Sequence, residues 1–377
     1  MKVAYLIPGT FNSGGMERVL CNKTNYLADV LGYDVSIITT DQQARAPFFR
    51  FSPNIEHYDL SVNYSELAGM GFFAKTRAYL KKQKLHRERL TEWLNREKYD
   101  IVISMFGPEV HWLPGIKDGS KKVAEIHFSK FFREQQARKG LWKLSDIVRS
   151  RQDEKAIGKY DRFVVLTEED KGYWGDKSNI SVIYNASVVK TDKTADGSAR
   201  RAIAVGRLTY QKGYPRLVEA WQTVHRKYPD WELVVFGSGE DADALNDQIR
   251  EKGLEKAIKM RPPTNKIEEE YLKSSIYVLS SHYEGLPMVL LEAMGCGVPA
   301  VAFTCKCGPR DVIDDGTDGI LVPEGDVTGL AEGICRLIED ETLRREMGKN
   351  AVRKVRDKFS EEKVMAQWDT LFKNLKN

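Results

Sequence analysis

Cysteine is scarce in this chain of 377 residues, and its pattern excludes several classes of protein. The five cysteines, Cys21, Cys296, Cys305, Cys307 and Cys335, are odd in number. The pair Cys305-Lys-Cys307 does not have the C-x-x-C spacing that is typical of metal and redox sites. We therefore expect reduced thiols in a cytosolic protein, and we do not expect a zinc site.

Long apolar runs are also missing, so we expect no helix that crosses a bilayer. The N-terminal segment MKVAYLIPG contains only a short apolar run that ends at Pro8-Gly9. It lacks both the apolar core and the small-residue cleavage site of a signal peptide, and we therefore do not expect export.

The length and the composition of the chain fit a soluble protein of two domains. Hydrophobic residues make up 42% of the chain and charged residues 30%, and the net charge is +4. Residues 1–190 hold 30 Lys and Arg against 23 Asp and Glu, whereas the remainder holds 28 against 31. The first half of the chain is therefore the basic one.

Short β-like runs alternate with longer amphipathic segments along the whole chain. Runs such as KVAYLIP, DIVISMF and ELVVF are apolar on both faces, as strands of a parallel sheet covered by helices should be. Helix-like segments, such as residues 74–97 and 214–227, lie between them. This alternation predicts a doubly wound α/β architecture.

The alternation is interrupted at residues 187–201, SVVKTDKTADGSARR. This segment is polar, and its apolar residues follow neither the helical nor the strand period. We therefore predict an N-terminal domain over residues 1–188 and a second domain over 189–361. A separate amphipathic helix over residues 362–377 ends the chain. Two such domains facing each other would form a cleft, and open α/β sheets bind ligands at the carboxyl ends of their strands.

Two features of the first domain follow predicted strands. Gly14 and Gly15 precede a helix, where unpaired backbone N–H groups can face an anion. A plain strand-to-helix turn explains the two glycines equally simply, and the local sequence favours it. His127 ends the run KVAEIH, where it could orient a substrate hydroxyl, although a lone histidine is more often structural.

Two cations of the second domain flank a turn after a strand, in VGRLTYQKG. Arg207 offers a fork of donors that suits phosphate, and Lys212 offers a mobile point charge. Such residues are more commonly solvated cations on the protein surface. The position at a strand's carboxyl end favours a role in binding.

The turn FGSGEDA follows the next strand. Gly237 and Gly239 formally begin a G-x-G-x-x-A fingerprint, but it lies in the middle of the chain and no ribose-binding acid follows the next strand. We predict a turn that lies near phosphate or is purely structural, and not an NAD site. Asp241 and Asp243 resemble a metal-binding pair, but acids at a helix start are favoured by the helix dipole in any case.

The segment YEGLPMVLLEAMGCGVP carries two glutamates in otherwise apolar surroundings, and buried carboxylates need partners. We expect a helix that starts at Pro287, with Glu284 in the loop before it and Glu292 within it. Such a helix start would stabilise an anionic ligand. Alternatively, Glu292 pairs with a core arginine and Glu284 is exposed. The N–H groups expected at the helix start belong to Gly285, Leu286, Met288 and Val289.

These motifs resemble, in their order, those of the family 4 retaining glycosyltransferases. The resemblance rests on GGMER, His127, GRLTYQKG, FGSGE, the E-x(7)-E segment and GTDGILVPEGD, which span nearly the whole chain. It implies the GT-B fold, which has two Rossmann-like domains and a C-terminal helix that crosses back to the first domain.

The resemblance also implies roles for the residues of the site. Arg207 and Lys212 would bind the donor diphosphate, Glu292 the ribose, and Glu284 the donor sugar. The Gly14-Gly15 loop would close over the phosphates, and His127 would approach the transferred sugar. Other donor-binding positions would be Gly237, Gly239, Gly285, Leu286, Pro287, Met288 and Val289.

The implied reaction moves a hexosyl or N-acetylhexosaminyl group from a nucleotide-diphosphate sugar, expected to be a UDP-sugar, to a saccharide acceptor. The configuration would be retained, and neither a metal nor another cofactor would be required. Three alternatives stay open: a nucleotide-sugar epimerase of the same fold, a non-catalytic nucleotide-sugar binding protein, and an NAD-dependent oxidoreductase.

Two basic segments of the first domain suggest where the acceptor is held. Residues 72–98 contain nine cations and three acids, and residues 130–159 contain nine cations and four acids. The second segment also contains the apolar residues Phe131, Phe132, Leu141 and Trp142. Such segments suit anionic membrane surfaces, although ordinary solvated helices explain them about equally well. We expect a cytoplasmic protein attached peripherally to the inner face of the membrane, a lipid-linked acceptor in polysaccharide or glycolipid assembly, and no nucleic acid partner.

Overall fold

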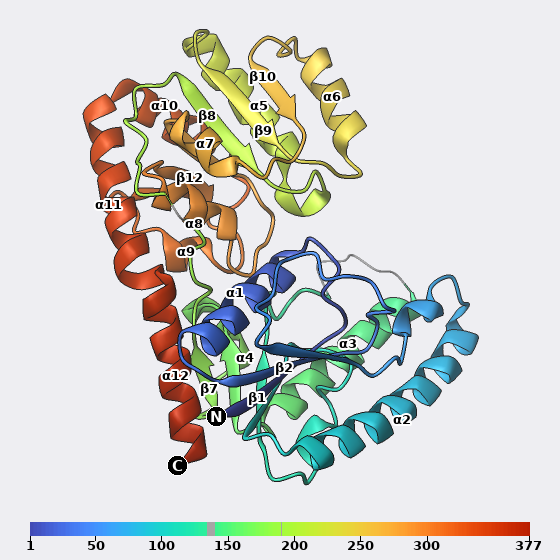
Figure 1. The fold of residues 1–377 in the computed structure, drawn as a ribbon. Coiled ribbons are helices and arrows are strands. Elements are labelled where there is room, and N and C mark those ends of the chain that lie inside the picture. The colour runs from blue at the N-terminus through green and yellow to red at the C-terminus, as the bar shows by residue number, and fades with distance from the viewer. Residues whose placement is uncertain (134–139, 190) are drawn as a thin grey trace. The chain divides into compact units, whose positions relative to one another are not determined.

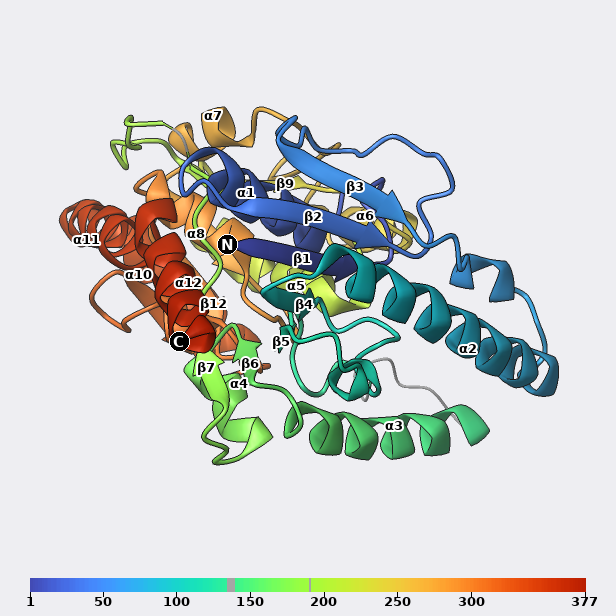
Figure 2. The same cartoon turned by 60° about the horizontal axis from the view of Figure 1, so that its bottom comes forward.

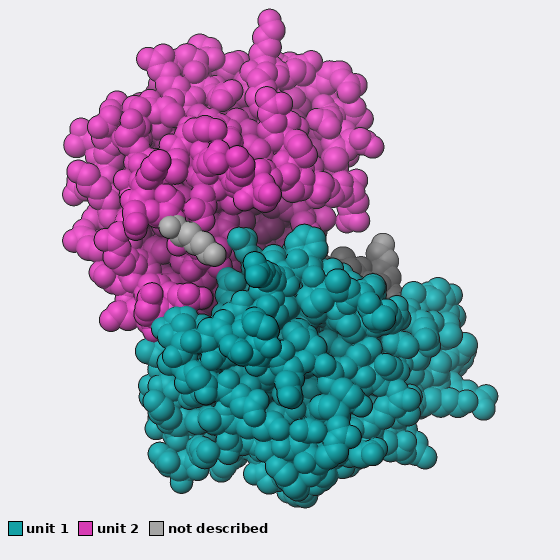
Figure 3. Space-filling view, in the orientation of Figure 1, with its two compact units in different colours: residues 1–166, 170–183, 365–377 teal, residues 167–169, 184–364 magenta. Residues whose placement is uncertain are grey.

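The structure is a computed structural model that describes residues 1–133, 140–189 and 191–377. It divides into two compact units, which Figure 3 shows in different colours. Unit 1 contains residues 1–166, 170–183 and 365–377, and unit 2 contains residues 167–169 and 184–364. The boundaries expected from the sequence, after residues 188 and 361, lie a few residues from these.

Unit 1 is built on a seven-stranded sheet in the order β3-β2-β1-β4-β5-β6-β7, with every neighbouring pair parallel (Figure 1). The strands are β1 (Lys2–Ile7), β2 (Asp34–Thr39), β3 (Ile55–Asp59), β4 (Ile101–Ser104), β5 (Lys121–Glu125), β6 (Arg162–Val165) and β7 (Ile180–Val182). The helices are α1 (Gly15–Asp29), α2 (Phe72–Glu97), α3 (Leu141–Ile157) and α4 (Glu168–Trp174), together with most of α12 (Glu361–Lys376).

Helices cover both faces of this sheet. Ala4 and Leu6 of β1 pack in one hydrophobic cluster with Leu90 and Leu94 of α2. Side chains alternate between faces along a strand, so Tyr5 points to the other face, where Lys23 of α1 lies over its ring. Figure 2 shows α2 and α3 along the sheet from a second direction.

Unit 2 repeats this architecture with a six-stranded parallel sheet in the order β10-β9-β8-β11-β12-β13. Its strands are β8 (Arg201–Val205), β9 (Glu232–Phe236), β10 (Ile258–Arg261), β11 (Ile276–Leu279), β12 (Ala300–Phe303) and β13 (Gly319–Val322). Its helices are α5 (Tyr214–Lys227), α6 (Ala242–Glu251), α7 (Ile267–Leu272), α8 (Met288–Gly295), α9 (Pro309–Val312), α10 (Val327–Glu339) and α11 (Glu341–Phe359). Trp221 of α5 is fully buried in the core against β-strand side chains such as Leu233.

The predicted doubly wound α/β fold is confirmed in both units. The sequence did not reveal β3, β7, β10 and β13. Strands β3 and β10 carry polar or exposed side chains, and β7 has only three residues. In the part of the chain that the structure describes, no helix is long and apolar enough to span a bilayer.

Candidate active site

Two loops of unit 2 leave neighbouring strands at the same edge of the sheet. Strands β8 and β11 are paired in parallel, so the loops that follow them emerge side by side. The N–H of His282 donates to the carbonyl of Gln211 at 2.8 Å, and the Gln211 side-chain amide donates to the carbonyl of Tyr283 at 3.1 Å. Ser280 Oγ donates to the carbonyl of Lys212 at 2.9 Å. These hydrogen bonds fix the two loops relative to each other at this edge of the sheet.

Lys212 and Glu284 meet across these loops. Lys212 Nζ lies 2.7 Å from Glu284 Oε1, and the two side chains are 14% and 6% exposed. Ser281 Oγ donates to the same Oε1 at 2.6 Å. The buried carboxylate therefore has a cation and a hydroxyl as partners, and the alternative of an exposed Glu284 is wrong.

Arg207 follows β8 on the same edge, and in contrast it is exposed. Its Nη2 lies 3.5 Å from Gln211 Oε1, at the outer limit of a hydrogen bond. The guanidinium is thus loosely held in a position from which it can reach an anion.

Helix α8 begins at Met288, one residue later than predicted, with Pro287 in an extended conformation before it. Within the described residues, no hydrogen bond is found for the backbone N–H groups of Gly285, Leu286, Met288 and Val289. Unsatisfied N–H groups at a helix start, together with the helix dipole, favour an anionic ligand.

Glu292 lies in α8 and is 6% exposed. The hydroxyl of Tyr271, from α7, donates to Glu292 Oε2 at 3.2 Å. Burial and the charge of Glu292 raise the pKa of Tyr271 well above its ordinary value, so the tyrosine stays a donor. A core arginine was one alternative predicted for this partner, but nothing in the sequence indicated the tyrosine.

Gly237 and Gly239 bring the loop after β9 into direct contact with the loop after β8. A Cβ atom at Gly237 would collide with the carbonyl oxygen of Gly206, and one at Gly239 with that of Leu208. The N–H of Leu208 donates to the carbonyl of Ser238 at 2.9 Å. These glycines therefore support the loop that carries Arg207.

The two glycines predicted in unit 1 begin α1, with Gly14 as the N-cap and Gly15 as the first helical residue. Glu17 lies in the first turn, and its carboxylate is close to Gly14 and accepts from Asn12 Nδ2 at 3.3 Å. An acid in the first turn is favoured by the helix dipole.

His127 lies just after β5 and not at its end, because the strand stops at Glu125. Its Nε2 is 3.0 Å from Glu125 Oε1, and the same oxygen contacts Nζ of Lys23 from α1. Although burial raises the pKa of the Glu125 carboxyl, the charges of Lys23 and His127 lower it to about 2. Neither Lys23 nor Glu125 was predicted from the sequence. The spacing E-x-H across the strand end is a signal for Glu125, but it does not include Lys23.

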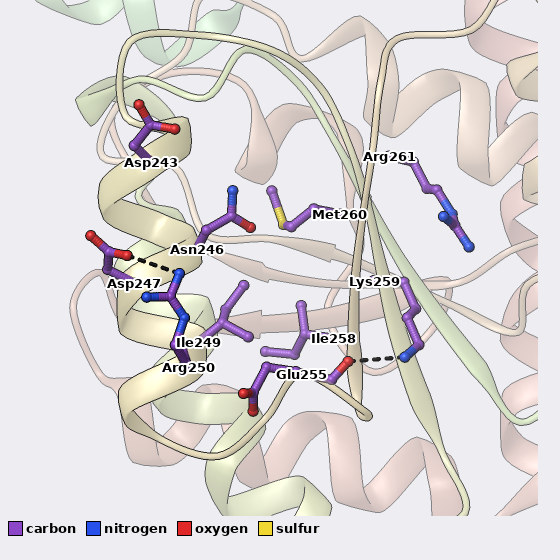
Figure 4. Close-up of a pocket in the computed structure, with 10 residues that line it drawn as sticks. All are labelled: Asp243, Asn246, Asp247, Ile249, Arg250, Glu255, Ile258, Lys259, Met260 and Arg261. Carbon is purple, nitrogen blue, oxygen red and sulfur yellow. Dashed lines mark hydrogen bonds and ion pairs between the residues drawn. The ribbon is translucent and has the colours of Figure 1, made fainter.

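A surface groove of unit 2 of about 590 Å³ lies between α6 and the edge strand β10 (Figure 4). It is lined by charged side chains such as Asp247 and Arg250, which form an ion pair at 3.2 Å. None of its lining residues belongs to the predicted donor site. The described residues contain no cluster of three or more His, Cys, Asp or Glu side chains that could hold a metal ion.

Comparison with known proteins decides the family. Residues 13–187 match the profile described as Glycosyltransferase Family 4, and residues 189–354 match the one described as Glycosyl transferases group 1. The chain belongs to glycosyltransferase family 4. The resemblance inferred from the motifs is thereby confirmed.

Relatives of this glycosyltransferase include bacterial proteins. An uncharacterized glycosyltransferase of Haemophilus influenzae is 29% identical, over 97% of this chain and 98% of the relative. The amylovoran biosynthesis glycosyltransferase AmsD of Erwinia amylovora is 33% identical, over 57% of this chain and 62% of AmsD. An N-acetylgalactosaminyltransferase of Campylobacter jejuni, named for an undecaprenol-diphosphate-linked acceptor, is 24% identical over 100% of this chain and 99% of that enzyme.

Solved structures share the fold of this glycosyltransferase. Sucrose-phosphate synthase of Thermosynechococcus elongatus superposes with a TM-score of 0.82 at 18% identity, covering 99% of this chain and 98% of that one. TarM of S. aureus, in a complex that contains UDP, gives a TM-score of 0.78 at 17% identity, covering 98% and 99%. Both likenesses agree with the GT-B fold expected from the motifs.

Proposed function

We propose that this glycosyltransferase moves a hexosyl or N-acetylhexosaminyl group from a UDP-sugar to a saccharide acceptor carried on a lipid. The configuration at the anomeric carbon is retained, and no divalent metal takes part. The acceptor belongs to polysaccharide or glycolipid assembly. In support, AmsD is named for amylovoran biosynthesis and the Campylobacter relative for a saccharide linked to undecaprenol diphosphate.

The observation that carries this proposal is the pairing of Lys212 with Glu284 beside the exposed Arg207 and the open start of α8. Breaking a sugar–phosphate bond places negative charge on the leaving diphosphate. Arg207, Lys212 and the helix start supply positive charge for that anion. Each well-placed donor contributes about 3 kcal/mol of transition-state stabilisation. Sufficient positive charge from the protein would make a divalent metal unnecessary.

Glu284 and Glu292 are assigned to different parts of the donor. Lys212 and Ser281 both contact Oε1 of Glu284, so Oε2 is the oxygen that we propose accepts from a hydroxyl of the donor sugar. Glu292 is proposed to accept from the ribose hydroxyls, with Tyr271 fixing its carboxylate. In unit 1, the Gly14-Gly15 loop is proposed to face phosphate, and His127 to approach the transferred sugar.

A lipid-linked acceptor is supported by the surface of α2. Phe73 and Leu80 are 83% and 64% exposed. At helical spacing they share one face with the exposed cations Arg77, Lys81 and Lys84. Exposed apolar side chains among cations suit an anionic membrane surface. Residues 134–139 of the second basic segment and the side chains of Leu141 and Trp142 lie outside the described residues.

A donor screen followed by a transfer assay tests the function. Thermal unfolding is measured with UDP-, GDP- and ADP-sugars, and the stabilising donor is then incubated in EDTA with saccharide-lipid acceptors extracted from bacterial membranes. We expect stabilisation by a UDP-sugar and an α-linked product from an α-linked donor, detected by NMR. Conversion of the donor without acceptor would indicate an epimerase, and stabilisation without any turnover would indicate a binding protein.

A further inference from the structure

An exposed aromatic ring lies in the loop that carries Arg207 and Lys212. Of the large hydrophobic side chains that the structure describes in unit 2, only Tyr210 is largely exposed, at 63%. Its ring is stacked on the imidazole of His282, with the ring centres 4.3 Å apart and the two planes 10° from parallel. The histidine therefore covers one face of the phenol ring, and the other face is turned to solvent.

The imidazole beneath this ring is itself fixed by groups from other segments. The backbone N–H of His282 donates to the carbonyl of Gln211 at 2.8 Å. Its Nδ1 lies 3.7 Å from Oε1 of Glu324, in the loop after β13, and the same oxygen accepts from Nη1 of Arg216 in α5 at 3.0 Å. Burial and the charge of Arg216 lower the pKa of His282, against the charge of Glu324, so the stacked imidazole is neutral at neutral pH. The phenol ring thus rests on a support that is ordered before any ligand binds.

The stacked pair is built on the two loops of the proposed diphosphate site. Tyr210 lies between Arg207 and Lys212 in the chain, and His282 lies two residues before Glu284. Hydrogen bonds between these loops fix them relative to each other. The exposed ring face therefore borders the place where the diphosphate is proposed to bind.

The proposed ribose partners lie across the sheet from the support of this stack. Tyr271 of α7, which donates to Glu292, packs its ring against Tyr277 of β11. Trp221 of α5 packs in the core cluster with Ile276, the preceding residue of the same strand. Neighbouring residues of a strand point to opposite faces, so α7 and α5 cover opposite faces of the sheet. This arrangement argues against a role for Tyr210 in stacking on the nucleotide base.

Retention of configuration would place the acceptor beside the diphosphate. The new bond to the anomeric carbon forms on the face from which the diphosphate oxygen leaves, whether directly or after a covalent intermediate. The acceptor sugar therefore lies next to the groups that hold the diphosphate. One face of a pyranose ring presents mainly C–H groups, which pack well on the face of an aromatic ring, while the polar edge of tyrosine remains in water.

We propose that the exposed face of Tyr210, supported by His282, is a stacking platform for the terminal sugar ring of the acceptor. Because the phenol ring is already held in place, little side-chain freedom is lost when the sugar binds. The ring face makes the contact, and the hydroxyl of Tyr210 is not required for it. This inference rests on the proposed function, which supplies the saccharide acceptor and the retained configuration.

The test is steady-state transfer with saccharide-lipid extracted from bacterial membranes, varied at saturating donor, followed by variation of the UDP-sugar. Tyr210→Ala should raise the acceptor concentration for half-maximal rate about fivefold or more, because the stacking contact is lost, and should leave the KM of the donor unchanged. Tyr210→Phe and Tyr210→Trp should keep the native acceptor dependence, since both keep a ring.

Tyr58→Ala is the matched control. Tyr58 is 38% exposed and is stacked on Trp93, with ring centres 3.4 Å apart, but it lies in β3 of unit 1. This variant should leave both constants unchanged. The proposal is overturned if Tyr210→Ala has the native acceptor dependence or only the effect of Tyr58→Ala. It is also overturned if the donor KM rises in place of the acceptor constant, or if Tyr210→Phe is as impaired as Tyr210→Ala.

Binding of free sugars separates this proposal from the proposed function. Saturation-transfer NMR is recorded in the presence of UDP with the methyl α-glycosides of glucose, galactose and N-acetylgalactosamine. If the wild type transfers sugar and Tyr210→Ala is unchanged, only the platform fails. If the wild type transfers nothing but a glycoside gives a signal that Tyr210→Ala abolishes, the transferase function fails and the platform stands. If neither transfer nor such a signal is found, both fail.

Discussion

Lys212 Nζ and Glu284 Oε1 lie 2.7 Å apart, although 72 positions separate the two residues in the chain. The pair forms because β8 and β11 are neighbours in the sheet and their loops leave the same edge. A carboxylate in an apolar segment is thus explained by a cation from a distant motif.

Removing Lys212 should impair both stability and catalysis. Lys212→Ala leaves the buried carboxylate of Glu284 without its cation, which should cost about 2 kcal/mol of unfolding free energy, since Lys212 is partly exposed. Turnover should fall about 100-fold or more because the leaving diphosphate loses a donor. Adding Glu284→Gln should recover stability but not turnover. Urea unfolding measures the change in stability, and the transfer assay measures the change in turnover. If the double variant recovered both stability and turnover, a binding role for Lys212 would be contradicted.

Removing Arg207 should impair catalysis alone. The side chain is exposed and only loosely held by Gln211, so Arg207→Ala should change the unfolding free energy by less than about 0.5 kcal/mol. We expect kcat/KM to fall about 100-fold. Arg200→Ala is the control, because Arg200 is also exposed but pairs with Asp230 at the start of β8. Comparable activity of the two variants would argue against a diphosphate site at Arg207.

Gly239 should tolerate no side chain. A Cβ atom there would collide with backbone of Leu208, which cannot move without displacing the loop that carries Arg207. Gly239→Ala should therefore cost about 2–3 kcal/mol, within the range for overpacking, and should lower activity. Gly172→Ala is the control, since nothing lies near the position of its Cβ. Thermal unfolding of both variants gives the comparison.

Because of Glu125, the free energy of unfolding should decrease as the pH is lowered. Its pKa is about 2 in the folded protein, against 4.5 as the ordinary value, so the unfolded chain binds the proton more readily. Its contribution, on the order of 3 kcal/mol, is present above about pH 4.5 and is lost as the pH falls toward 2. Glu125→Gln lacks this contribution. The stability gap between wild type and Glu125→Gln, measured by urea unfolding, should therefore narrow between pH 6 and pH 3, and a constant gap would be inconsistent with this pKa.

The exposed face of α2 should bind anionic vesicles. Combining Phe73→Ser with Leu80→Ser should weaken cosedimentation with phosphatidylglycerol vesicles at least about tenfold, because two apolar side chains no longer enter the bilayer surface. Val30→Ser is the control, since Val30 is 62% exposed but lies beyond the end of α1. If neither variant alters binding, or if the wild type does not bind at low salt, the membrane proposal is wrong.

Much of the fold was predictable because apolar periodicity is local. The runs that became β1, β4 and β9 are apolar on both faces and were identified directly. The strands β3 and β10 were not, because their side chains are partly polar or exposed and only pairing with β2 and β9 defines them as strands.

The site was predictable as a set of residues, and less so as a set of contacts. Motif order identified Arg207, Lys212, Glu284 and Glu292. The partners Ser281 and Tyr271 belong to segments with no chemical signature of their own. Lys23 was likewise invisible, because nothing in the sequence of α1 shows that it faces the end of β5.

The sequence by itself determined the alternation of strands and helices, the order of the motifs and the family to which they belong. Each strand, helix and motif consists of residues close together in the chain, so it can be recognised without the tertiary structure. Only the tertiary structure decided which partner each buried carboxylate has. Glu284 pairs with Lys212, Glu292 with Tyr271, and Glu125 with both Lys23 and His127. Parallel sheets bring the ends of distant strands together, and burial at those ends makes each pairing obligatory, because a charge removed from water must find its partner within the fold.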